Sequence, residues 1–419
     1  MQAQSPGTES LVIQLAVTKM SFKGNKDKVN LSPKVQLQDE VILITGGSGF
    51  LGQHIVRVLQ ERAEGLKEIR IADTTPYIPK LPFQEKFPIK FYSADVTIEA
   101  QLDEPFDGAT AVIHCAASIQ VGHYVDRERS RDVNVNGTSN VVNKCQEWNV
   151  PKLVLTSTVD ALIKKDSNFY DQGEEGLKLP TREEDCLIGS YAFTKALSEE
   201  VVRGRKILAN GNDLKTTILR PTVIYGELDP YYVPEVLRTA KVTWGYLPKP
   251  SCLPKGAVLQ GTYAGNVAWA HVLAVTKLRE ELLSSPDNKS QKAEVEDDTS
   301  SVNGKVLFVT DDTPPEIMYD FMVPFLEVRG FSLVQLPLPL FMLAAWVWLV
   351  SSLIRLFPDS WKRCAQANPV LPTYESFQMV HKMVHFSRAR AIQCLNYSPI
   401  YGSTQAMELS AEYYKGIVI

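Results

Sequence analysis

The chain has 419 residues, of which 44% are hydrophobic and 22% are charged, an ordinary composition for a folded protein with a large core. Its 44 basic and 48 acidic residues give a net charge of −4, so no basic surplus points to nucleic-acid binding. The six cysteines show neither CxxC nor Cys/His ligand spacing, which favours reduced thiols over disulfides. We therefore expect no nucleic-acid partner and no bound metal.

Residues 1–38 are polar and aperiodic, and they predict a flexible N-terminal extension without a secretory signal. A short apolar run over Val41–Thr45 then predicts a first strand. Three glycines follow it at GxxGxxG spacing: Gly46, Gly49 and Gly52. In a dinucleotide-binding βαβ unit such glycines make the tight turn, admit a pyrophosphate and let the helix lie close to the sheet.

The helical pattern over Phe50–Glu61 begins at once, so Phe50 and Leu51 would present backbone N–H groups to the phosphates. A second strand, Ile69–Asp73, ends about 20 residues after the glycines in a carboxylate that would hold a ribose diol. Asp73 would repel a 2′-phosphate, and no arginine follows it directly to bind one. The sequence therefore favours NAD over NADP.

The alternation of strands and helices continues along the chain. Further strands are predicted at Ile89–Ala94, Ala111–Cys115, Lys152–Thr156 and Lys215–Leu219, and helices at Ile98–Leu102, Val125–Trp148 and Ser190–Leu208. Buried strands separated by helices predict an α/β fold with a Rossmann-type, doubly wound parallel sheet. Ligands of such sheets bind at the carboxyl ends of the strands.

Two of these strand ends carry further candidates for cofactor contacts. Asp95, followed by Val96, can accept a hydrogen bond from an adenine amino group, or it can cap the turn that begins at Thr97. Small residues after His114, among them Ala116, would let the backbone pass close to a ribose. His114 itself is interpreted as a structural histidine rather than a catalyst.

Tyr191 and Lys195 are four residues apart on a predicted helix and therefore project from the same face. A phenol has a pKa of about 10, and a neighbouring ammonium or a cationic nicotinamide lowers it. The pair predicts proton transfer between the phenol and an alcohol or carbonyl while hydride moves, although an ordinary surface pair has the same spacing. Hydroxyls near the preceding strand end, Thr158 first and Ser157 second, would orient the substrate oxygen unless they only cap a turn.

The sequence divides into a nucleotide-binding domain over residues 39–220 and a substrate-binding region over 221–419, which is richer in proline, tyrosine and tryptophan at its start. Within the second region, residues 284–301 are acidic and polar and predict an exposed, disordered insertion. Residues 336–354 carry no charge and are long enough for a bilayer span. They predict a membrane-associated segment, with a helix buried in the core as the alternative.

Together these features resemble the 3β-hydroxysteroid dehydrogenase/Δ5-4 isomerase family of the extended short-chain dehydrogenase/reductase superfamily. The resemblance runs from about Val41 to Gly402. Besides the motifs above, it rests on the segments Arg220–Gly226, Tyr263–His271, Asp311–Pro314 and Ser387–Pro399.

The resemblance implies NAD-dependent oxidation of the 3β-hydroxyl of a steroid or sterol, on a Rossmann fold with interleaved substrate-binding elements. It makes Tyr191 the acid–base, Lys195 its partner and Thr158 the assisting hydroxyl. It also places Pro221 and Val223 beside the nicotinamide.

The isomerase activity stays open at this point. Asp311 and Asp312 match acidic residues that members with both activities are thought to use for double-bond migration. The same residues can also form a capping turn before Pro314, and sterol dehydrogenases of the family lack the isomerase step.

The resemblance further implies the endoplasmic reticulum membrane, or a mitochondrial one, and the superfamily commonly forms homodimers. If the tail over Phe386–Gly402 packs on the substrate region, it lies on the same side of the bilayer as the active site. A single crossing by residues 336–354 would separate the two. We therefore expect a monotopic or re-entrant segment, an active site that faces the cytosol and a sterol that arrives from lipid.

Two other functions remain as alternatives. One is another extended dehydrogenase/reductase with a nucleotide-sugar or dihydroflavonol-like substrate, and the uncharged segment argues against the charged nucleotide sugar. The other is a non-catalytic NAD(P)-sensing protein, against which the presence of both Tyr191 and Lys195 argues.

Overall fold

The structure is a computed structural model that describes residues 33–253, 256–284 and 300–419. Nearly all of the predicted insertion over 284–301, and most of the predicted extension over 1–38, lie outside the described residues. The fold nevertheless begins before residue 38. β1 (Val35–Gln36) pairs in parallel with β3 (Ala63–Glu64), and the side chain of Leu37 is fully buried.

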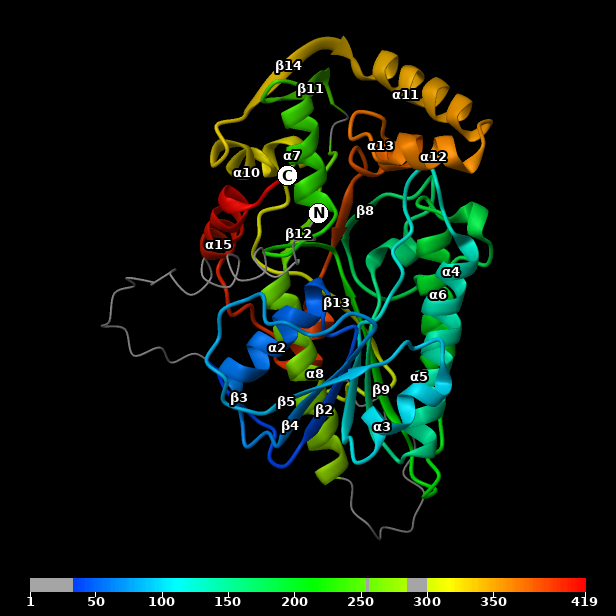
Figure 1. Ribbon diagram of the computed structural model, residues 1–419, viewed down its shortest axis with the longest axis vertical. Coiled ribbons are helices and arrows are strands. Elements are labelled where there is room, and N and C mark those ends of the chain that lie inside the picture. The colour runs from blue at the N-terminus through cyan, green and yellow to red at the C-terminus, as the bar shows by residue number, and fades with distance from the viewer. Residues whose placement is uncertain (1–32, 254–255, 285–299) are drawn as a thin grey trace, which may run out of the picture.

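A seven-stranded parallel sheet forms the core of the lower half of the molecule as drawn in Figure 1. Its spatial order is β13 (Val306–Val309), β9 (Lys215–Pro221), β7 (Lys152–Thr156), β6 (Ala111–His114), β2 (Val41–Thr45), β4 (Glu68–Asp73) and β5 (Ile89–Ser93). The chain builds outward from β2 in one direction and then returns to build in the other, which puts the switch in strand order between β2 and β6. The predicted fold class of an α/β protein with a Rossmann-type parallel sheet is confirmed, and all six predicted strands are present.

Helices cover both faces of this sheet: α2 (Phe50–Arg62), α8 (Ala264–Ser284) and α14 (Ala389–Leu395) on one, and α3 (Asp103–Phe106), α5 (Gly137–Glu147) and α6 (Ser190–Val202) on the other. Because successive side chains of a strand point to opposite faces of the sheet, a short strand such as β2 can pack against the helices on both faces. Ile42 and Ile44 of β2 pack with α2 and α8, whereas Leu43 packs with the helices opposite. Burial on both faces is why these strands are continuously apolar.

Two predicted helices differ from the structure. The helix expected over Val125–Trp148 consists of α4 (Arg127–Arg131), a π-helical turn over Asp132–Asn136 and α5. The helix expected to reach Leu208 ends at Val202, because Arg203 is extended and Gly204 has a positive φ of 80°. The short pattern at Ile98–Leu102 forms a 3-10 turn over Glu99–Leu102, named η1.

The chain after residue 220 builds a second layer above the carboxyl ends of the strands. It contains the pair β10 (Val223–Tyr225) and β12 (Gly261–Tyr263), and the helices α7 (Tyr232–Val242), α9 (Met318–Phe321), α10 (Val323–Glu327) and α15 (Ser403–Gly416). Its core is aromatic, with Tyr225, Tyr263, Phe325 and Tyr414 buried together. The same part of the chain returns α8 and β13 to the Rossmann sheet, so the two regions interleave.

The helices α11 (Leu340–Arg355), α12 (Asp359–Gln366) and α13 (Tyr374–Met379) form a cap at the far end of the molecule (Figure 1). The parallel pair β11 (Tyr246–Cys252) and β14 (Ser332–Pro339) leads into it, and β15 (Val384–Phe386) leads out by pairing with β8 (Phe169–Gln172). In α11 only Val347, Ser351 and Ile354 are buried.

The alternative of a core helix over residues 336–354 is therefore wrong, since most apolar side chains of α11 are exposed. Those with the largest exposed fractions are Phe341, Met342, Trp346, Trp348, Leu349 and Leu353. The structure also contains no membrane-spanning helix in the predicted membrane-associated segment. Within the described ranges, no helix combines the length and the apolar character that a bilayer crossing needs.

Candidate active site

The glycine-rich turn lies between β2 and α2 and is packed too tightly for side chains. Gly46 has a φ of 73°, and a Cβ atom there would lie 2.7 Å from the backbone nitrogen of Ala116. A Cβ atom on Gly52 would lie 2.5 Å from the carbonyl oxygen of Gly46. Gly49 has the extended conformation of an N-cap, so α2 begins directly at Phe50 with Leu51 behind it. The first turn of α2 therefore offers backbone N–H groups at the carboxyl edge of the sheet.

Asp73 stands beside this turn at the end of β4. Its Oδ2 accepts a hydrogen bond from the backbone N–H of Ser48 at 3.0 Å, and its Oδ1 accepts one from Thr75 N–H at 2.9 Å. The Ser48 hydroxyl in turn donates to the Thr75 carbonyl at 2.8 Å. The carboxylate is half-buried and fixed next to the glycine-rich turn, where a ribose-binding acid would have to lie.

Asp95 follows β5 and shows the capping role that the sequence left open. Its Oδ1 accepts from the backbone N–H and the hydroxyl of Thr97 at 2.9 and 2.8 Å, and its Oδ2 lies 3.2 Å from Arg129. Burial alone would raise the pKa of Asp95, but these contacts outweigh it and lower the pKa. Val96 is buried against Gly137. A contact between Asp95 and adenine stays a prediction.

Tyr191 and Lys195 lie on α6, and both are buried at the carboxyl end of β7. The Lys195 ammonium donates to the carbonyl oxygen of Thr156 at 2.6 Å, and burial lowers its pKa to about 8. Burial, and then the charge of Asp160, hold the pKa of Tyr191 well above its ordinary value. The expected lowering of that pKa by Lys195 is not seen in the protein alone, because the amine points to a strand carbonyl.

The two candidate hydroxyls have different surroundings. Ser157 donates to Glu199 Oε1 at 2.6 Å, and the same carboxylate forms a buried ion pair with Arg220 at 2.5 Å. Thr158 is the N-cap of η3 (Val159–Leu162) and donates to Asp160 Oδ2 at 3.0 Å. Thus Ser157 belongs to an ion-pair network of the scaffold, whereas Thr158 both caps a turn and faces an acidic side chain.

His114 has both ring nitrogens engaged in the sheet. Nδ1 lies 2.6 Å from the hydroxyl of Thr45, and Nε2 lies 3.0 Å from that of Thr138. Burial lowers its pKa to about 3, so the ring is neutral. These contacts agree with the interpretation of His114 as a structural residue.

Sequence reasoning missed two groups that hold α6 in place. The Glu199–Arg220 pair joins α6 to β9, although Arg220 was named only as part of a motif. Asn134, in the π-helical turn, accepts from the N–H of Ser118 at 2.7 Å and donates to the Thr194 hydroxyl at 2.9 Å. π-Helical turns are frequent at functional sites, but no short sequence pattern predicts where a π-helical turn forms.

The two acidic residues that the resemblance links to double-bond migration make contacts within the scaffold. Asp311 accepts from Tyr263 N–H and from the Asn266 side chain, each at 2.8 Å, and from Thr313 N–H at 2.9 Å. Asp312 is exposed and pairs with Arg388. The alternative of a capping turn thus describes the contacts of Asp311.

The remaining candidates lie near the same edge of the sheet. Pro221 ends β9 and is paired with Val309 of β13. Val223 opens β10 and is half-buried.

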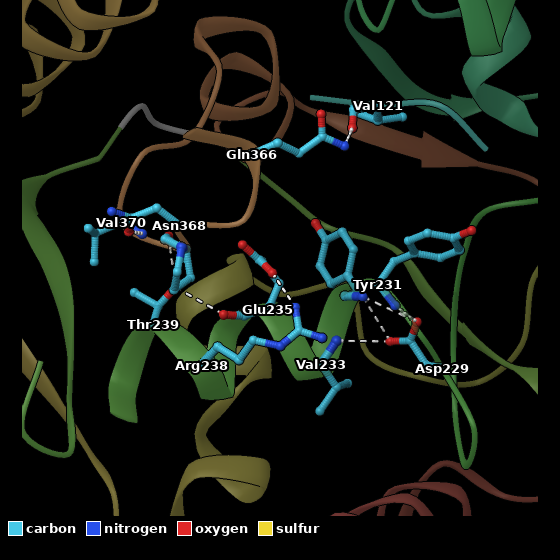
Figure 2. Close-up of polar contacts among 12 residues, drawn as sticks. Val121, Asp229, Tyr231, Val233, Glu235, Arg238, Thr239, Gln366, Asn368 and Val370 are labelled. Carbon is cyan, nitrogen blue, oxygen red and sulfur yellow. Dashed lines mark hydrogen bonds and ion pairs between the residues drawn. The ribbon is translucent and has the colours of Figure 1, made fainter. Parts of the chain in front are cut away.

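A cavity of about 890 Å³ opens between the cap and the start of α6, next to Gly189 and Ser190. Much of its lining is charged, and acidic side chains outnumber basic ones: Asp126, Arg127, Glu128, Lys165, Glu183, Glu184, Arg355, Asp359, Lys362 and Glu375. Polar contacts join the cap to other parts of the molecule (Figure 2). Gln366 donates to the carbonyl of Val121 at 3.3 Å, and Thr239 of α7 donates to the carbonyl of Pro369 at 3.1 Å. The cap is therefore tied both to the nucleotide-binding part and to α7.

Comparison with known proteins places these features in a family. Residues 43–340 match the sequence model of the 3-beta hydroxysteroid dehydrogenase/isomerase family. Among solved structures, UDP-glucose 4-epimerase of Thermus thermophilus in complex with NAD is similar, with 22% identity, a TM-score of 0.58, and coverage of 90% of this chain and 100% of that one. UDP-glucose 4-epimerase of Thermotoga maritima with UDP-glucose has 19% identity and a TM-score of 0.57, with coverage of 90% and 98%. At these identities the likeness shows the fold.

Proposed function

Because the chain belongs to the 3-beta hydroxysteroid dehydrogenase/isomerase family, we propose that it oxidises the 3β-hydroxyl of a steroid or sterol to the ketone with NAD. The observation that carries the proposal is the placement of Tyr191, which is buried one helical turn before Lys195 at the carboxyl edge of the sheet, where α6 packs against η3. This is where an α/β sheet of this order binds its ligands.

The residues around the glycine-rich turn fit a dinucleotide. Gly46 and Gly52 leave no space for a side chain between the turn, Ala116 and α2, so a pyrophosphate would meet backbone N–H groups. Asp73 is held in place by the N–H groups of Ser48 and Thr75, and its carboxylate would accept from a ribose 2′-hydroxyl and repel a 2′-phosphate. When bound, NAD accepts the hydride.

The chain's own groups would handle the proton of the reaction. Tyr191 is a protonated phenol at neutral pH, since burial raises its pKa. It is therefore suited to donate a proton to a carbonyl, and it needs additional positive charge to accept one from an alcohol. Since the Lys195 amine donates to the Thr156 carbonyl and does not lower the pKa of the phenol, this charge would come mainly from the cationic nicotinamide of bound NAD.

The exposed face of α11 supports a membrane contact without a span. Phe341, Trp346, Trp348 and Leu353 project outward, and the segment 331–354 contains no charged residue. Tryptophan-rich apolar faces are typical of helices that lie in a membrane interface. We extend the proposal to a monotopic attachment through the cap, with the active site on the cytosolic side of the endoplasmic reticulum and a sterol that arrives from lipid.

Flotation with liposomes tests the membrane part. The protein should float with neutral phospholipid vesicles, and replacing Phe341, Trp346 and Trp348 by serine should leave it at the bottom of the gradient. Val347 is the wrong residue to change, because it is buried. If the triple variant still floats, the cap is not the site of membrane attachment.

The charged lining of the cavity favours a second candidate. A charged lining suits a polar ligand such as a nucleotide sugar better than a steroid body, although acidic side chains outnumber basic ones there and Arg355 and Lys362 are paired with Glu375 and Asp359. The two solved epimerases, which share the fold, are described with NAD in one case and with UDP-glucose in the other. In this case the chain would carry out NAD-dependent chemistry on the sugar of a nucleotide sugar.

One assay separates the two functions. Lipid-reconstituted protein is incubated with NAD and either a panel of 3β-hydroxysteroids or a panel of UDP-sugars, and NADH and the products are measured. Steroid-dependent NADH formation without turnover of UDP-sugars supports the first proposal. If the protein epimerises or oxidises a UDP-sugar and does not turn over any steroid, the second proposal replaces the first.

A further inference from the structure

The cap is held over the way into the proposed active site by a small set of polar contacts with the loop between β6 and α4. We propose that the cap is a lid, and that binding of its helices to a lipid surface breaks these contacts and lets the substrate enter. This rests on the proposed function, because it requires the membrane attachment through the cap. The protein would then be most active at a lipid surface.

The cavity of about 890 Å³ lies between the cap and the proposed acid–base. Its walls include Gly189 and Ser190, which directly precede Tyr191, and the loop residues 121–128. Further walls come from residues of the cap between 355 and 375. A substrate that approaches Tyr191 through this cavity therefore passes between the loop and the cap.

The loop is fixed at both ends by the nucleotide-binding part. Ser118 exchanges two backbone hydrogen bonds with the side chain of Asn134, at 2.7 and 3.0 Å. Asp126 accepts from the backbone N–H of Arg129 at 2.9 Å and so caps α4. Between these two ends, the residues 121–124 bond to the cap instead.

Gln366, the last residue of α12, makes two of these bonds. Its side chain donates to the carbonyl of Val121 at 3.3 Å (Figure 2) and accepts from the backbone N–H of Tyr124 at 2.9 Å. Gly122 lies directly against it, since a Cβ atom there would be 2.9 Å from Cδ of Gln366. Gly122 also has a φ of 128°, which glycine adopts without strain.

Two further bonds come from neighbouring residues. His123 Nε2 donates to the carbonyl of Leu371 at 2.8 Å. Arg363 of α12 donates to the Tyr124 hydroxyl at 2.8 Å, and its guanidinium lies 4.2 Å from the centroid of the same ring. These two bonds and the two of Gln366 are called the latch below.

The latch can open at small cost. α12, which the structure describes in full, buries Ala365 and leaves its other residues at least partly exposed. Gln366 and Arg363 are exposed, so water can replace their hydrogen bonds when the latch breaks. Segments that open locally are typically those that bury few apolar side chains and form their hydrogen bonds close to solvent.

The helices of the cap hold one another and should therefore move together. α11 packs against both α12 and α13. The backbone N–H of Tyr374 in α13 donates to the hydroxyl of Ser351 in α11 at 3.3 Å, and Arg355 pairs with Glu375. A movement of α11 toward a lipid surface therefore carries the latch residues of α12 with it.

The apolar side chains beside the latch favour the open state at a lipid surface. Trp361 is 63% exposed and stacks on Phe357 with ring centroids 5.2 Å apart, and Leu356 is 83% exposed. Trp361 and Arg363 are two residues apart on α12, so they project roughly 200° apart around the helix. Trp361 thus points away from the latch, and aromatic residues of this kind settle at membrane interfaces.

The position of α12 makes the difference between the closed and open states. Figure 1 shows α12 between α11 and the nucleotide-binding part. Trp361 and Leu356 can reach the surface that holds α11 when α12 moves toward it, which is away from the loop. The open state then offers more apolar area to the lipid than the closed state, and this differential contact shifts the equilibrium toward opening.

Hydrogen exchange of the full-length protein, with and without neutral phospholipid vesicles, tests the lid. The reporter is the backbone N–H of Tyr124, because it donates to Gln366 across the latch. Vesicles should speed its exchange by about 10-fold, as expected if lipid binds the open state about 10-fold more tightly than the closed one. The N–H of Ser118, which donates to Asn134, should change by less than about 2-fold because that contact stays closed.

A pair of tryptophan variants sharpens this measurement. Trp361→Ser should lose the acceleration at Tyr124 while the protein still floats with the vesicles through α11. Trp348→Ser is the matched control, since it removes a tryptophan of similar exposure, 55% against 63%, from the outer face of α11. It should keep both flotation and the acceleration.

Turnover of a 3β-hydroxysteroid with NAD, measured with and without vesicles, gives a second readout. Wild type should be about 10-fold faster with vesicles, whereas Gln366→Ala, which removes two latch bonds, should show a ratio of about 2-fold or less. Gly122→Ala should behave in the same way, because its Cβ atom displaces the side chain of Gln366. Asn368→Ala is the control and should keep the wild-type ratio, since Asn368 accepts from Val370 N–H within the cap (Figure 2).

Three results would overturn the lid. The first is a wild-type protein that floats with vesicles but shows unchanged exchange at Tyr124. The second is a Trp361→Ser variant that keeps the acceleration. The third is a Gln366→Ala variant with the same vesicle ratio as Asn368→Ala.

The failure of the lid and that of the proposed function are distinguishable. A protein that does not float loses the membrane attachment and the lid together. A protein that floats and exchanges faster at Tyr124, but oxidises no 3β-hydroxysteroid, keeps the lid and loses the steroid activity.

Discussion

The nucleotide-binding part and the cap bury their side chains in opposite ways. In the first, charged groups are buried and paired, as with Glu199 and Arg220, and the strands are apolar on both faces. In the cap, α11 buries Val347, Ser351 and Ile354 and exposes most of its other large apolar side chains. The comparison shows that other parts of the chain cover the apolar side chains of the nucleotide-binding part. The exposed apolar side chains of α11 could be covered only by a surface outside the protein.

The largest expected effect on stability comes from breaking the buried ion pair between Glu199 and Arg220. Glu199→Ala leaves Arg220 as an uncompensated buried charge, so the free energy of unfolding should fall by about 3–5 kcal/mol. Glu235→Ala is the matched control, because its pair with Arg238 is about half exposed and should contribute less than about 1 kcal/mol. Chemical denaturation of both variants checks this. Equal losses would show that burial does not set the cost of breaking these two ion pairs.

A substitution in the glycine-rich turn should be nearly as damaging as the loss of the Glu199–Arg220 ion pair. Gly52→Ala would place a Cβ atom 2.5 Å from the Gly46 carbonyl oxygen, which costs about 3 kcal/mol if the turn has to shift. Because the shifted turn has to regain its original shape to hold the pyrophosphate, the same cost lowers NAD affinity by about 100-fold, which calorimetry measures. Gly402→Ala is the control, since a Cβ atom there meets nothing within 4 Å. NAD affinity equal to wild type in Gly52→Ala would contradict the assigned cofactor site.

Lys195 offers a smaller and pH-dependent effect. Its pKa is about 8 in the folded protein, against an ordinary value of 10.5 for a solvated lysine. Between these values the unfolded chain binds more protons than the folded one, so wild-type stability rises with pH. Lys195→Met lacks this slope. It should be more stable than wild type by about 1 kcal/mol at pH 7, a gain typical of removing a strained functional group.

That gain should shrink as the pH rises from about 8 to 10.5, because the wild-type amine is then neutral and no charge is buried. Urea midpoints of the two proteins across this range measure the gap. A gap that stays constant with pH, or a wild type that is the more stable at pH 7, would show that burial does not act on Lys195 as described.

The smallest effect belongs to the outer face of α11. Trp348 is 55% exposed and Val347 is 3% exposed, although they are neighbours in the sequence. Trp348→Ser should change the free energy of unfolding by less than about 0.5 kcal/mol, whereas Val347→Ser should lower it by about 1–2 kcal/mol. A larger loss at Trp348 would mean that the cap packs differently.

Most of the sheet could be predicted, because six of its seven strands have a clear local sequence pattern. Runs such as Val41–Thr45 and Lys152–Thr156 are apolar, short and bounded by turn residues, and the structure has both unchanged. The strand Val306–Val309 was missed, since a four-residue run next to a polar segment gives a weak signal. The cap could not be predicted, because an apolar helix has the same sequence whether it is buried in a core or exposed on a surface.

The site was only partly predictable for a related reason. The Tyr191 and Lys195 spacing indicated one helical face, but no pattern showed that the amine would point to the Thr156 carbonyl. Ser157 and Thr158 are adjacent in the sequence and look alike. One donates to Glu199 and the other to Asp160, and only the packing of α6 decides which.

The measurement that bears most directly on the proposed chemistry is NADH formation by Tyr191→Phe with a 3β-hydroxysteroid, alongside calorimetric titration with NAD. The phenol hydroxyl is removed and the ring that fills the site is kept, so turnover should fall by about 100-fold or more while NAD binding is preserved. A variant that turns over the steroid at the wild-type rate would contradict the assignment of Tyr191 as the acid–base.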